Sequence, residues 1–238
     1  MNCLIIAAGH GSRLRDISPS KPLTPVAGVP LIEHVARAAA AGGASAFIVV
    51  TGHEAERLEA FLAGLSERLG LPIDPVRIAD WDRPNGYSVL AGADAIAGDY
   101  LLTMSDHLFD PAIVRLLLAA PAAALTLAVD RDLDNPLLDM DDATKVALGA
   151  EGAIARIGKT LDRFDAIDTG LFRATPALAA AIRAAVADGG AGSLSDGVQR
   201  LADQGKAMTV EIKGARWLDV DDAPALAKAE AMLAPVRT

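Results

Sequence analysis

The chain opens with a short apolar run, Leu4-Ile5-Ile6-Ala7-Ala8, that leads into Gly9-His10-Gly11-Ser12-Arg13-Leu14 and is followed by Lys21-Pro22-Leu23. An apolar run without alternation is typical of a buried parallel strand. Glycine permits a tight turn and lets backbone N–H groups approach an anion closely. Arg13 and Lys21 add positive charge to the same segment. The stretch therefore predicts a strand that ends in a phosphate-binding loop.

The composition of the chain limits the kinds of protein to which it can belong. The chain has 238 residues, of which 52% are hydrophobic, and this is enough to build a sizeable core in a single domain spanning residues 1–238. The net charge of −9 argues against a large nucleic-acid footprint, because phosphate backbones need clustered Lys and Arg. A small anionic substrate stays compatible with local positive charge. With Cys3 as its one cysteine, the chain has neither an intrachain disulfide nor a thiolate metal cluster.

Targeting signals are also missing from the sequence. No basic segment precedes an apolar signal-like stretch, and the longest apolar run, near residues 116–129, is interrupted by Pro121. We therefore expect a cytoplasmic protein without a membrane segment. The sequence leaves open whether the chain forms a homodimer.

Strand-like and helix-like segments alternate through the first half of the chain. Helix start and stop signals recur there, such as Pro30 before a segment that ends at Gly42-Gly43, and Asp110-Pro111 at the start of another. This alternation predicts an α/β fold with a doubly wound, mostly parallel sheet over residues 1–130. Residues 131–220 read as an elaboration of that sheet with an inserted β-hairpin around 144–157, and residues 221–238 as a C-terminal helix.

Acidic residues follow two predicted strands. Asp106 comes directly after the run 100–104, and ligands bind at the carboxyl ends of strands in open α/β sheets. Asp219 and Asp221 alternate with apolar residues and would repel each other unless a cation or water lies between them. Mg²⁺ prefers such oxygen ligands. From spacing alone, Asp106 could equally cap a turn, and the Asp219–Asp221 pair could be a solvated strand edge.

Other polar positions have ordinary explanations. The acidic segment 130–142 begins with the alternation of a calcium loop, but Asn135 stands where that loop needs glycine, so a solvated or substrate-covering loop is favoured. Lys145 and Lys159 lie on the two hairpin strands, where exposed lysines are common. Asp168-Thr169-Gly170 interrupts an apolar strand, which indicates either a ligand contact or a bulge. The four histidines show no paired-ligand spacing, so no histidine metal site is expected.

Taken together, these motifs resemble those of nucleotidyltransferases of the sugar-phosphate and MobA-like kind, which couple an NTP to a phosphorylated small molecule. The glycine loop with Lys21-Pro22-Leu23 carries the general signature, in which Ser12 replaces the usual threonine. The sequence is most similar to the cytidylyltransferases that act on inositol 1-phosphate, although Ser105 stands where glycine usually precedes the metal aspartate. The segments that carry this closer resemblance are residues 85–88, 102–107, 143–146, 157–159, 168–172 and 217–221.

The resemblance implies a Rossmann-like, GT-A-like fold and a set of roles. Residues 1–130 would bind the nucleotide, and residues 131–220 would bind the acceptor and supply the second metal ligand. Mg²⁺ is the implied cofactor, and an NTP and a phosphorylated acceptor are the implied small-molecule partners. The implied catalytic residues are Arg13, Lys21 and Asp106. The implied nucleotide-binding residues are Ala7, Ala8, Gly9, Gly11, Ser12, Arg13, Lys21, Asn85 and Gly86. The implied acceptor-binding residues are Lys145, Lys159, Asp168, Thr169 and Gly170, and the implied metal ligands are Asp106 and Asp219, with Asp221 as second choice.

Several functions fit these residues to different degrees. The first is transfer of a nucleotidyl group, with CTP favoured, to inositol 1-phosphate or a similar polyol phosphate. A sugar 1-phosphate with UTP or GTP is the runner-up, and phosphocholine is third because aromatic residues, which cage quaternary ammonium groups, are only 4% of the chain. A nucleotide-binding module without turnover is the rival from another class. A dinucleotide oxidoreductase is disfavoured because Leu14 stands where the third glycine of G-x-G-x-x-G is needed.

Overall fold

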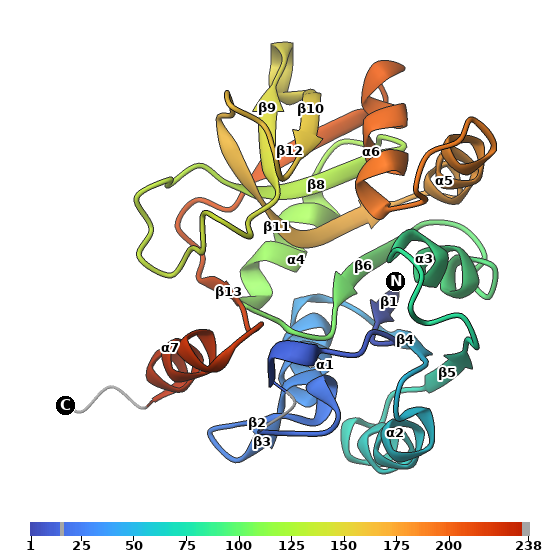
Figure 1. Cartoon of the computed structure of the whole chain (residues 1–238), viewed down its shortest axis with the longest axis vertical. Coiled ribbons are helices and arrows are strands. Elements are labelled where there is room, and N and C mark those ends of the chain that lie inside the picture. Colours follow the sequence, from blue (N-terminus) through green and yellow to red (C-terminus); the bar gives the residue numbers. More distant parts are fainter. Residues whose placement is uncertain (15–16, 235–238) are drawn as a thin grey trace.

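The structure, a computed structural model, describes residues 1–14 and 17–234, and the side chain of Ser12 lies outside this description. Figure 1 shows the elements in chain order. The helices are α1 (Leu31–Gly42), α2 (Ala55–Leu69), α3 (Gly86–Ala93), α4 (Pro111–Ala119), α5 (Ala177–Ala187), α6 (Leu194–Asp203) and α7 (Ala223–Leu233), with 3-10 turns η1 (Ser12–Leu14), η2 (Lys21–Leu23) and η3 (Ala150–Gly152). The strands are β1 (Asn2–Ile6), β2 (Pro25–Val26), β3 (Val29–Pro30), β4 (Ala46–Thr51), β5 (Ile73–Arg77), β6 (Tyr100–Met104), β7 (His107–Phe109), β8 (Leu125–Asp130), β9 (Lys145–Leu148), β10 (Ile154–Gly158), β11 (Ala166–Ala174), β12 (Ala207–Glu211) and β13 (Trp217–Asp219).

Nine strands form one mostly parallel sheet. Its path runs β10-β9-β11-β6-β1-β4-β5, and β8 pairs with β11 and β12. Strands β6, β1, β4 and β5 are parallel, as are β8 and β12, whereas β11 runs antiparallel between β6 and β8. The amino-terminal half of β11 pairs with β9, and its carboxyl-terminal half pairs with β6. The β9–β10 hairpin therefore joins the sheet beyond the carboxyl-terminal end of β6.

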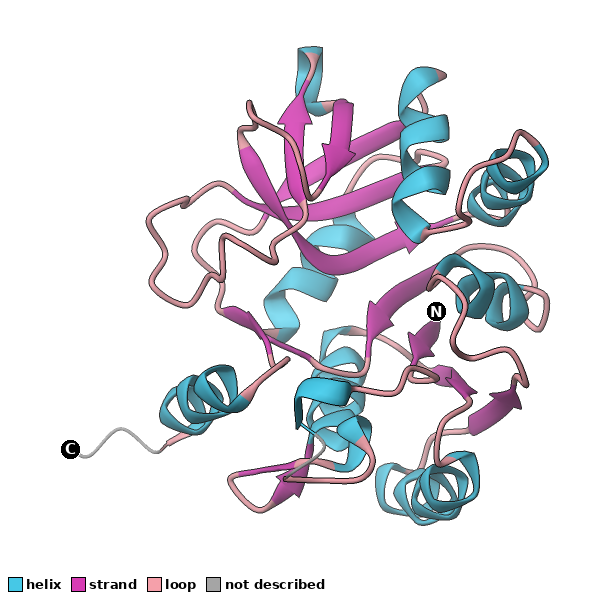
Figure 2. Ribbon diagram, in the orientation of Figure 1, coloured by secondary structure: helices cyan, strands magenta, loops and turns pink. Residues whose placement is uncertain are grey.

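Helices cover both faces of this sheet (Figure 2). Because successive strand residues point to opposite faces, Leu4 and Ile6 lie in the core under α3, α5 and α6, while Cys3 and Ile5 lie in the core under α1, α2 and α4. This is the doubly wound arrangement that the alternation of segments predicts. No helix in the described part of the chain is long and apolar enough to cross a membrane.

A second, two-stranded sheet brings Asp106 and Asp219 close together. Strand β7 follows β6 after two residues and pairs antiparallel with β13, which places Asp219 opposite His107. Leu108, Leu218 and Val220 pack beneath this pair in a third apolar cluster, together with residues of α1 and α7. The pairing of residues far apart in sequence therefore fixes the position of the segment 105–107 and of residues 219–221.

The predicted alternation of strands and helices over residues 1–130 is present, and the predicted strand over residues 100–104 is β6 to the residue. The predicted hairpin is confirmed, since β9 and β10 pair antiparallel. One feature was not predicted. Residues 107–109, which follow the candidate turn at Asp106, form the short strand β7. Local sequence favours a turn at Ser105-Asp106-His107, but pairing with the distant β13 makes the next residues extended.

Candidate active site

Two cavities meet at the carboxyl ends of β1 and β6. The first, of about 380 Å³, is lined by the glycine loop, Arg13, Lys21 and Asp106, and we call it the loop cavity. The second, of about 540 Å³, is lined by residues of the segment 137–144, by Lys159 and Asp168, and by α7, and we call it the hairpin cavity. Asn85, Met104 and Asp221 line both. The two cavities are therefore compartments of one site.

The loop cavity is built by the first strand and the turn after it. Ala7, Ala8, Gly9 and Gly11 line it, and Gly11 has φ +59°. A Cβ on Gly11 would come within 2.3 Å of the Cβ of Lys21, so glycine here allows the Lys21 side chain to pass directly over the loop. Lys21 is buried, and its ammonium points to the junction of the cavities. The structure thus brings the two parts of the opening motif together.

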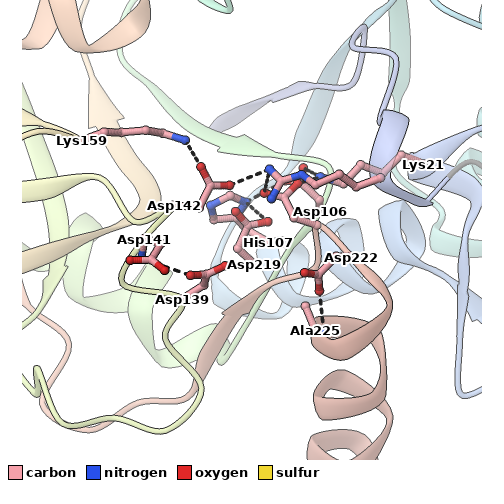
Figure 3. A network of polar contacts seen from close by, with 12 residues as sticks. Lys21, Asp106, His107, Asp139, Asp141, Asp142, Lys159, Asp219, Asp222 and Ala225 are labelled. Atoms are coloured by element: carbon pink, nitrogen blue, oxygen red, sulfur yellow. Dashed lines mark hydrogen bonds and ion pairs between the residues drawn. The ribbon is translucent and has the colours of Figure 1, made fainter.

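Lys21 binds two carboxylates that lie far from it in the chain. Its Nζ donates to Asp106 Oδ2 at 2.5 Å and also to Asp221 Oδ1. Asp106 Oδ1 in turn accepts from His107 Nδ1 at 2.7 Å. Figure 3 shows these contacts continuing through Asp142 to Lys159. The resulting network alternates in sign from the glycine loop to the hairpin.

Arg13 and Asp142 form the middle of that network. Arg13 Nη2 lies 2.6 Å from Asp142 Oδ2 and 3.0 Å from Asp221 Oδ2, and Lys159 Nζ donates to Asp142 Oδ1. Through hydrogen bonds from Lys159 and Arg13, the pKa of Asp142 is held well below its ordinary value. One carboxylate thus joins a cation of the loop cavity to a cation of the hairpin.

Protonation at the junction is set by burial and by opposed charges. Burial alone would lower the pKa of Lys21, but Asp106 and Asp221 outweigh it and raise the pKa above the ordinary value. Burial would raise the pKa of Asp106, but Lys21 and His107 keep it far below its ordinary value. For His107, the nearby Asp219 and Asp106 overcome the effect of burial and raise the pKa to about 9. At neutral pH, His107 is therefore a cation that donates to Asp106.

Ligand atoms of Asp106, His107 and Asp219 lie within 4.8 Å of one another. Because His107 donates to Asp106, the two carboxylates are the members of this group that could hold a metal ion. Asp219 Oδ1 is buried and has no hydrogen-bond partner among the described residues. Burial, together with the charges of Asp106 and Asp221, raises the pKa of Asp219 to about 7. An orphaned carboxylate oxygen beside a second carboxylate fits a hard divalent cation, which would satisfy the oxygen and lower this pKa.

The lining of the hairpin cavity combines polar and apolar residues. Lys159, Asp168 and Gly170 line it, together with Leu137, Leu138 and Met140. Asp168 accepts the N–H of Gly170 at 2.7 Å, and burial raises the pKa of Asp168 to about 6. Gly170 has φ +74° within β11, where the pairing with β8 shifts register between Asp168 and Phe172. The polar segment 168–170 therefore lies in an irregular part of β11, and this part of the strand also lines the hairpin cavity.

Two of the residues expected to bind an acceptor point elsewhere. Thr169 is fully buried, and its hydroxyl donates to the carbonyl of Ala128 at 2.8 Å. Lys145 Nζ donates to the Lys159 carbonyl at 3.1 Å and lies over the Phe164 ring, outside the lining of the hairpin cavity. Asn85 lies at the junction, where its Oδ1 accepts the N–H of Leu194, and Gly86 packs against the Gly192 carbonyl below it. The structure thus brings Lys159 but not Lys145 to the site.

The sequence does not single out His107, Asp142 or the bridging role of Asp221. No spacing signal identifies them, because their contacts come from residues far away in the chain. Asp221 lies beyond the end of β13 and pairs with Lys21 and Arg13, so it is separated from Asp219, which faces His107. In the acidic segment, Asp130 accepts from Trp217 Nε1 and Asn135 Nδ2, so hydrogen bonds within the protein occupy it.

Known proteins are similar to this chain in sequence or in fold. A bifunctional IPC transferase and DIPP synthase of Rubrobacter xylanophilus is 35% identical over 96% of this chain and 51% of its own length, and one of Archaeoglobus fulgidus is 31% identical over 72% and 32%. The chain thus spans about half or less of the length of these curated relatives. The structure of the inositol-1-phosphate CTP transferase from T. maritima superposes with a TM-score of 0.82 at 21% identity, covering 98% of both chains.

Sugar-nucleotide enzymes share the fold as well. A putative glucose-1-phosphate thymidylyltransferase from Bacillus anthracis has a TM-score of 0.83 at 17% identity, covering 100% of this chain and 97% of its own. The family model of the MobA-like NTP transferase domain matches residues 3–203. The fold class and the resemblance to nucleotidyltransferases inferred from the sequence are thereby confirmed, and the chain belongs to the MobA-like NTP transferase family.

Proposed function

We propose that this chain catalyses Mg²⁺-dependent transfer of a nucleotidyl group from an NTP, with CTP favoured, to a phosphorylated polyol such as inositol 1-phosphate. The observation that carries the proposal is the meeting of two cavities at one cluster of charges. Lys21 and Asp106 line the loop cavity, Lys159 and Asp168 line the hairpin cavity, and Asp221 lines both. An NTP in the first and an acceptor in the second would bring their phosphates together at this cluster.

In the proposed reaction, a phosphate oxygen of the acceptor attacks the α-phosphorus of the NTP in line. A new P–O bond forms as the bond between the α-phosphorus and its bridging oxygen breaks, and pyrophosphate leaves with that electron pair. The glycine loop and Arg13 hold the β- and γ-phosphates, and Lys21 neutralises charge on the α-phosphate. Positioning and charge neutralisation are sufficient for such a transfer, and no covalent enzyme intermediate is needed.

Asp106 and Asp219 would hold the Mg²⁺ ion. When bound, it would supply positive charge that neutralises phosphate oxygens. His107 donates to Asp106 and thereby orients this carboxylate, as partners of metal-binding side chains commonly do. Asp221, already engaged by Lys21 and Arg13, is the second choice as a ligand.

The hairpin cavity and the relatives support the proposed acceptor class. Lys159 would bind the acceptor phosphate, and the Asp168 carboxylate would accept hydrogen bonds from hydroxyl groups beside the Gly170 turn. The names of the relatives, which include an inositol-1-phosphate CTP transferase, support a polyol phosphate. Phosphocholine is less suited, because a quaternary ammonium favours an aromatic cage and the described lining of this cavity offers chiefly Trp217 and His107.

Pyrophosphate release tests the proposal. The purified protein with Mg²⁺ is given each of four NTPs together with inositol 1-phosphate, glucose 1-phosphate or phosphocholine. We expect release to require both substrates, to be fastest with CTP and inositol 1-phosphate, and to stop when EDTA is added. Fastest turnover with UTP or GTP and glucose 1-phosphate would instead identify a sugar nucleotidyltransferase. Binding of NTP without release in any combination would identify a non-catalytic module.

A further inference from the structure

Three aromatic rings pack together beside the loop cavity. His10 belongs to the glycine loop after β1, His53 follows β4, and Trp81 follows β5. Ring centroids lie 4.3 Å apart for His10 and His53, 5.1 Å for His53 and Trp81, and 5.7 Å for His10 and Trp81. The rings meet at tilted or edge-to-face angles, which are favourable geometries for aromatic pairs. The cluster therefore joins three loops at one edge of the sheet.

Trp81 is the member of this cluster that lines the loop cavity. The cavity lining in the described residues includes Trp81 but neither His10 nor His53, so both histidines support the indole from outside. The backbone at Gly52 lies directly against it, since a Cβ on Gly52 would come within 2.4 Å of the Trp81 Cβ. Trp81 also packs against the apolar core of one sheet face and is only partly exposed. The indole is thus held in a fixed position at the cavity wall.

The position of Trp81 separates it from the phosphate-binding end. Strand order in this part of the sheet is β6-β1-β4-β5, with adjacent strands about 4.8 Å apart. Asp106 follows β6, and Lys21 reaches to it, so the charged end of the cavity lies on the β6 side. Trp81 packs against residues that follow β4 and lies on the opposite side. An NTP whose phosphates lie at Lys21 would extend its nucleoside toward Trp81.

We propose that Trp81 is a binding residue for the nucleobase, which stacks on the indole. This inference rests on the proposed role of the loop cavity as the NTP site. Every base presents a π-face, so stacking adds affinity without choosing among bases. The choice of base is then left to polar groups in the same cavity, such as the Asn85 amide, whose oxygen is already fixed by Leu194. Trp81 should therefore contribute to binding of CTP and of other NTPs alike.

A base-free ligand separates stacking from phosphate binding. The full chain is titrated by calorimetry with CTP and with inorganic tripolyphosphate in the presence of Mg²⁺. Trp81→Leu, which keeps apolar packing but removes the π-surface, should weaken CTP binding by about 5- to 150-fold. Trp81→Phe should keep most of the affinity. Binding of tripolyphosphate should stay within about twofold in both variants, because the phosphate end is unchanged.

Fluorescence gives an independent readout, since the chain has two tryptophans. CTP should quench the emission of the wild type and of Trp217→Phe, and the quenching should be lost in Trp81→Phe. Unchanged CTP affinity in Trp81→Leu would overturn the inference. Equal weakening of CTP and tripolyphosphate would overturn it too, because Trp81 would then act by holding the glycine loop through His10. Failure of the wild type to bind any NTP would instead overturn the proposed function on which the inference rests.

Discussion

The imidazole of His107 lies directly against the backbone of Gly170. A Cβ placed on Gly170 would come within 2.2 Å of the ring carbon Cδ2 and 2.4 Å of Nε2. His107 is the first residue of β7, and Gly170 lies in β11 with φ +74°. The same glycine donates its N–H to Asp168. Gly170 therefore contacts both His107, which donates to Asp106, and Asp168, a carboxylate of the hairpin cavity.

Gly170→Ala should cost both stability and activity. The left-handed backbone alone costs an L-residue about 1–2 kcal/mol, and the new methyl group must also push the imidazole away from Asp106. Gly98→Ala is a matched control, since Gly98 has φ +82° and no atom lies within 4 Å of the place its new methyl group would take. Urea unfolding should show a larger loss for Gly170→Ala, and pyrophosphate release should fall in that variant alone. Equal effects of the two substitutions would show that His107 adapts to the methyl group.

The two hairpin lysines should differ in their effect on acceptor binding. Lys159 lines the hairpin cavity, whereas Lys145 donates to the Lys159 carbonyl outside the lining. We expect Lys159→Ala to raise the KM for the phosphorylated acceptor about tenfold or more, because a charge-assisted contact to phosphate is lost. Lys145→Ala should change that KM by less than about threefold. Steady-state kinetics at saturating NTP measure both, and a larger effect of Lys145→Ala would contradict the arrangement.

Asp142 should oppose binding of phosphates in the free enzyme. Its carboxylate occupies Arg13 and Lys159, the cations proposed to bind the phosphates of the two substrates. Asp142→Asn removes this competing charge, so the Kd for the phosphorylated acceptor should fall several-fold. Asp141→Asn is the matched control on the neighbouring exposed residue. A higher Kd in Asp142→Asn than in the control would show that the carboxylate assists binding rather than opposing it.

The same substitution should change how stability depends on pH. The pKa of Asp142 is lowered in the folded state, so its ion pairs stabilise the protein above the unfolded pKa of about 4. This stabilisation is lost as pH falls through the lowered pKa. Since the partners are partly exposed, the contribution is on the order of 1 kcal/mol. Unfolding in urea at pH 7 should show Asp142→Asn less stable than the wild type, and the difference should shrink below pH 4.

The sequence predicts this fold well because its signals are local. Apolar runs indicate the strands, and proline and glycine indicate the helix ends, so the predicted strand over residues 100–104 coincides with β6. The site is harder to predict, because its contacts are not local. Arg13 meets Asp142 across 129 residues, and Lys21 meets Asp221 across 200. The spacing of residues in the sequence indicates a loop with cationic side chains and acidic residues at strand ends. It does not indicate which carboxylate pairs with which cation.

The orientation of the Thr169 side chain also could not be predicted from the sequence. The resemblance to nucleotidyltransferases implies that Thr169 contacts an acceptor along with Asp168, whereas the polar interruption alone indicates either a ligand contact or a bulge. In the irregular part of β11, however, the Asp168 side chain lines the hairpin cavity, while the Thr169 side chain points into the sheet and donates to Ala128. Successive strand residues face opposite ways, and only the register of β11 decides which of the two faces the cavity.

Acceptor binding should depend on pH through Asp168. Burial raises the pKa of this carboxyl to about 6, against the opposing charge of His107, so the group changes protonation within the working range of an enzyme assay. An ionised Asp168 accepts hydrogen bonds from hydroxyls on all its free lone pairs, whereas the protonated form accepts fewer. The KM for a polyol phosphate should therefore rise as pH falls below about 6, while the KM for the NTP stays flat. Asp168→Asn should raise the acceptor KM at pH 8 and reduce this inflection to the part that comes from the acceptor phosphate, whose second pKa is also about 6. An inflection as large in Asp168→Asn as in the wild type would assign the titration to another group.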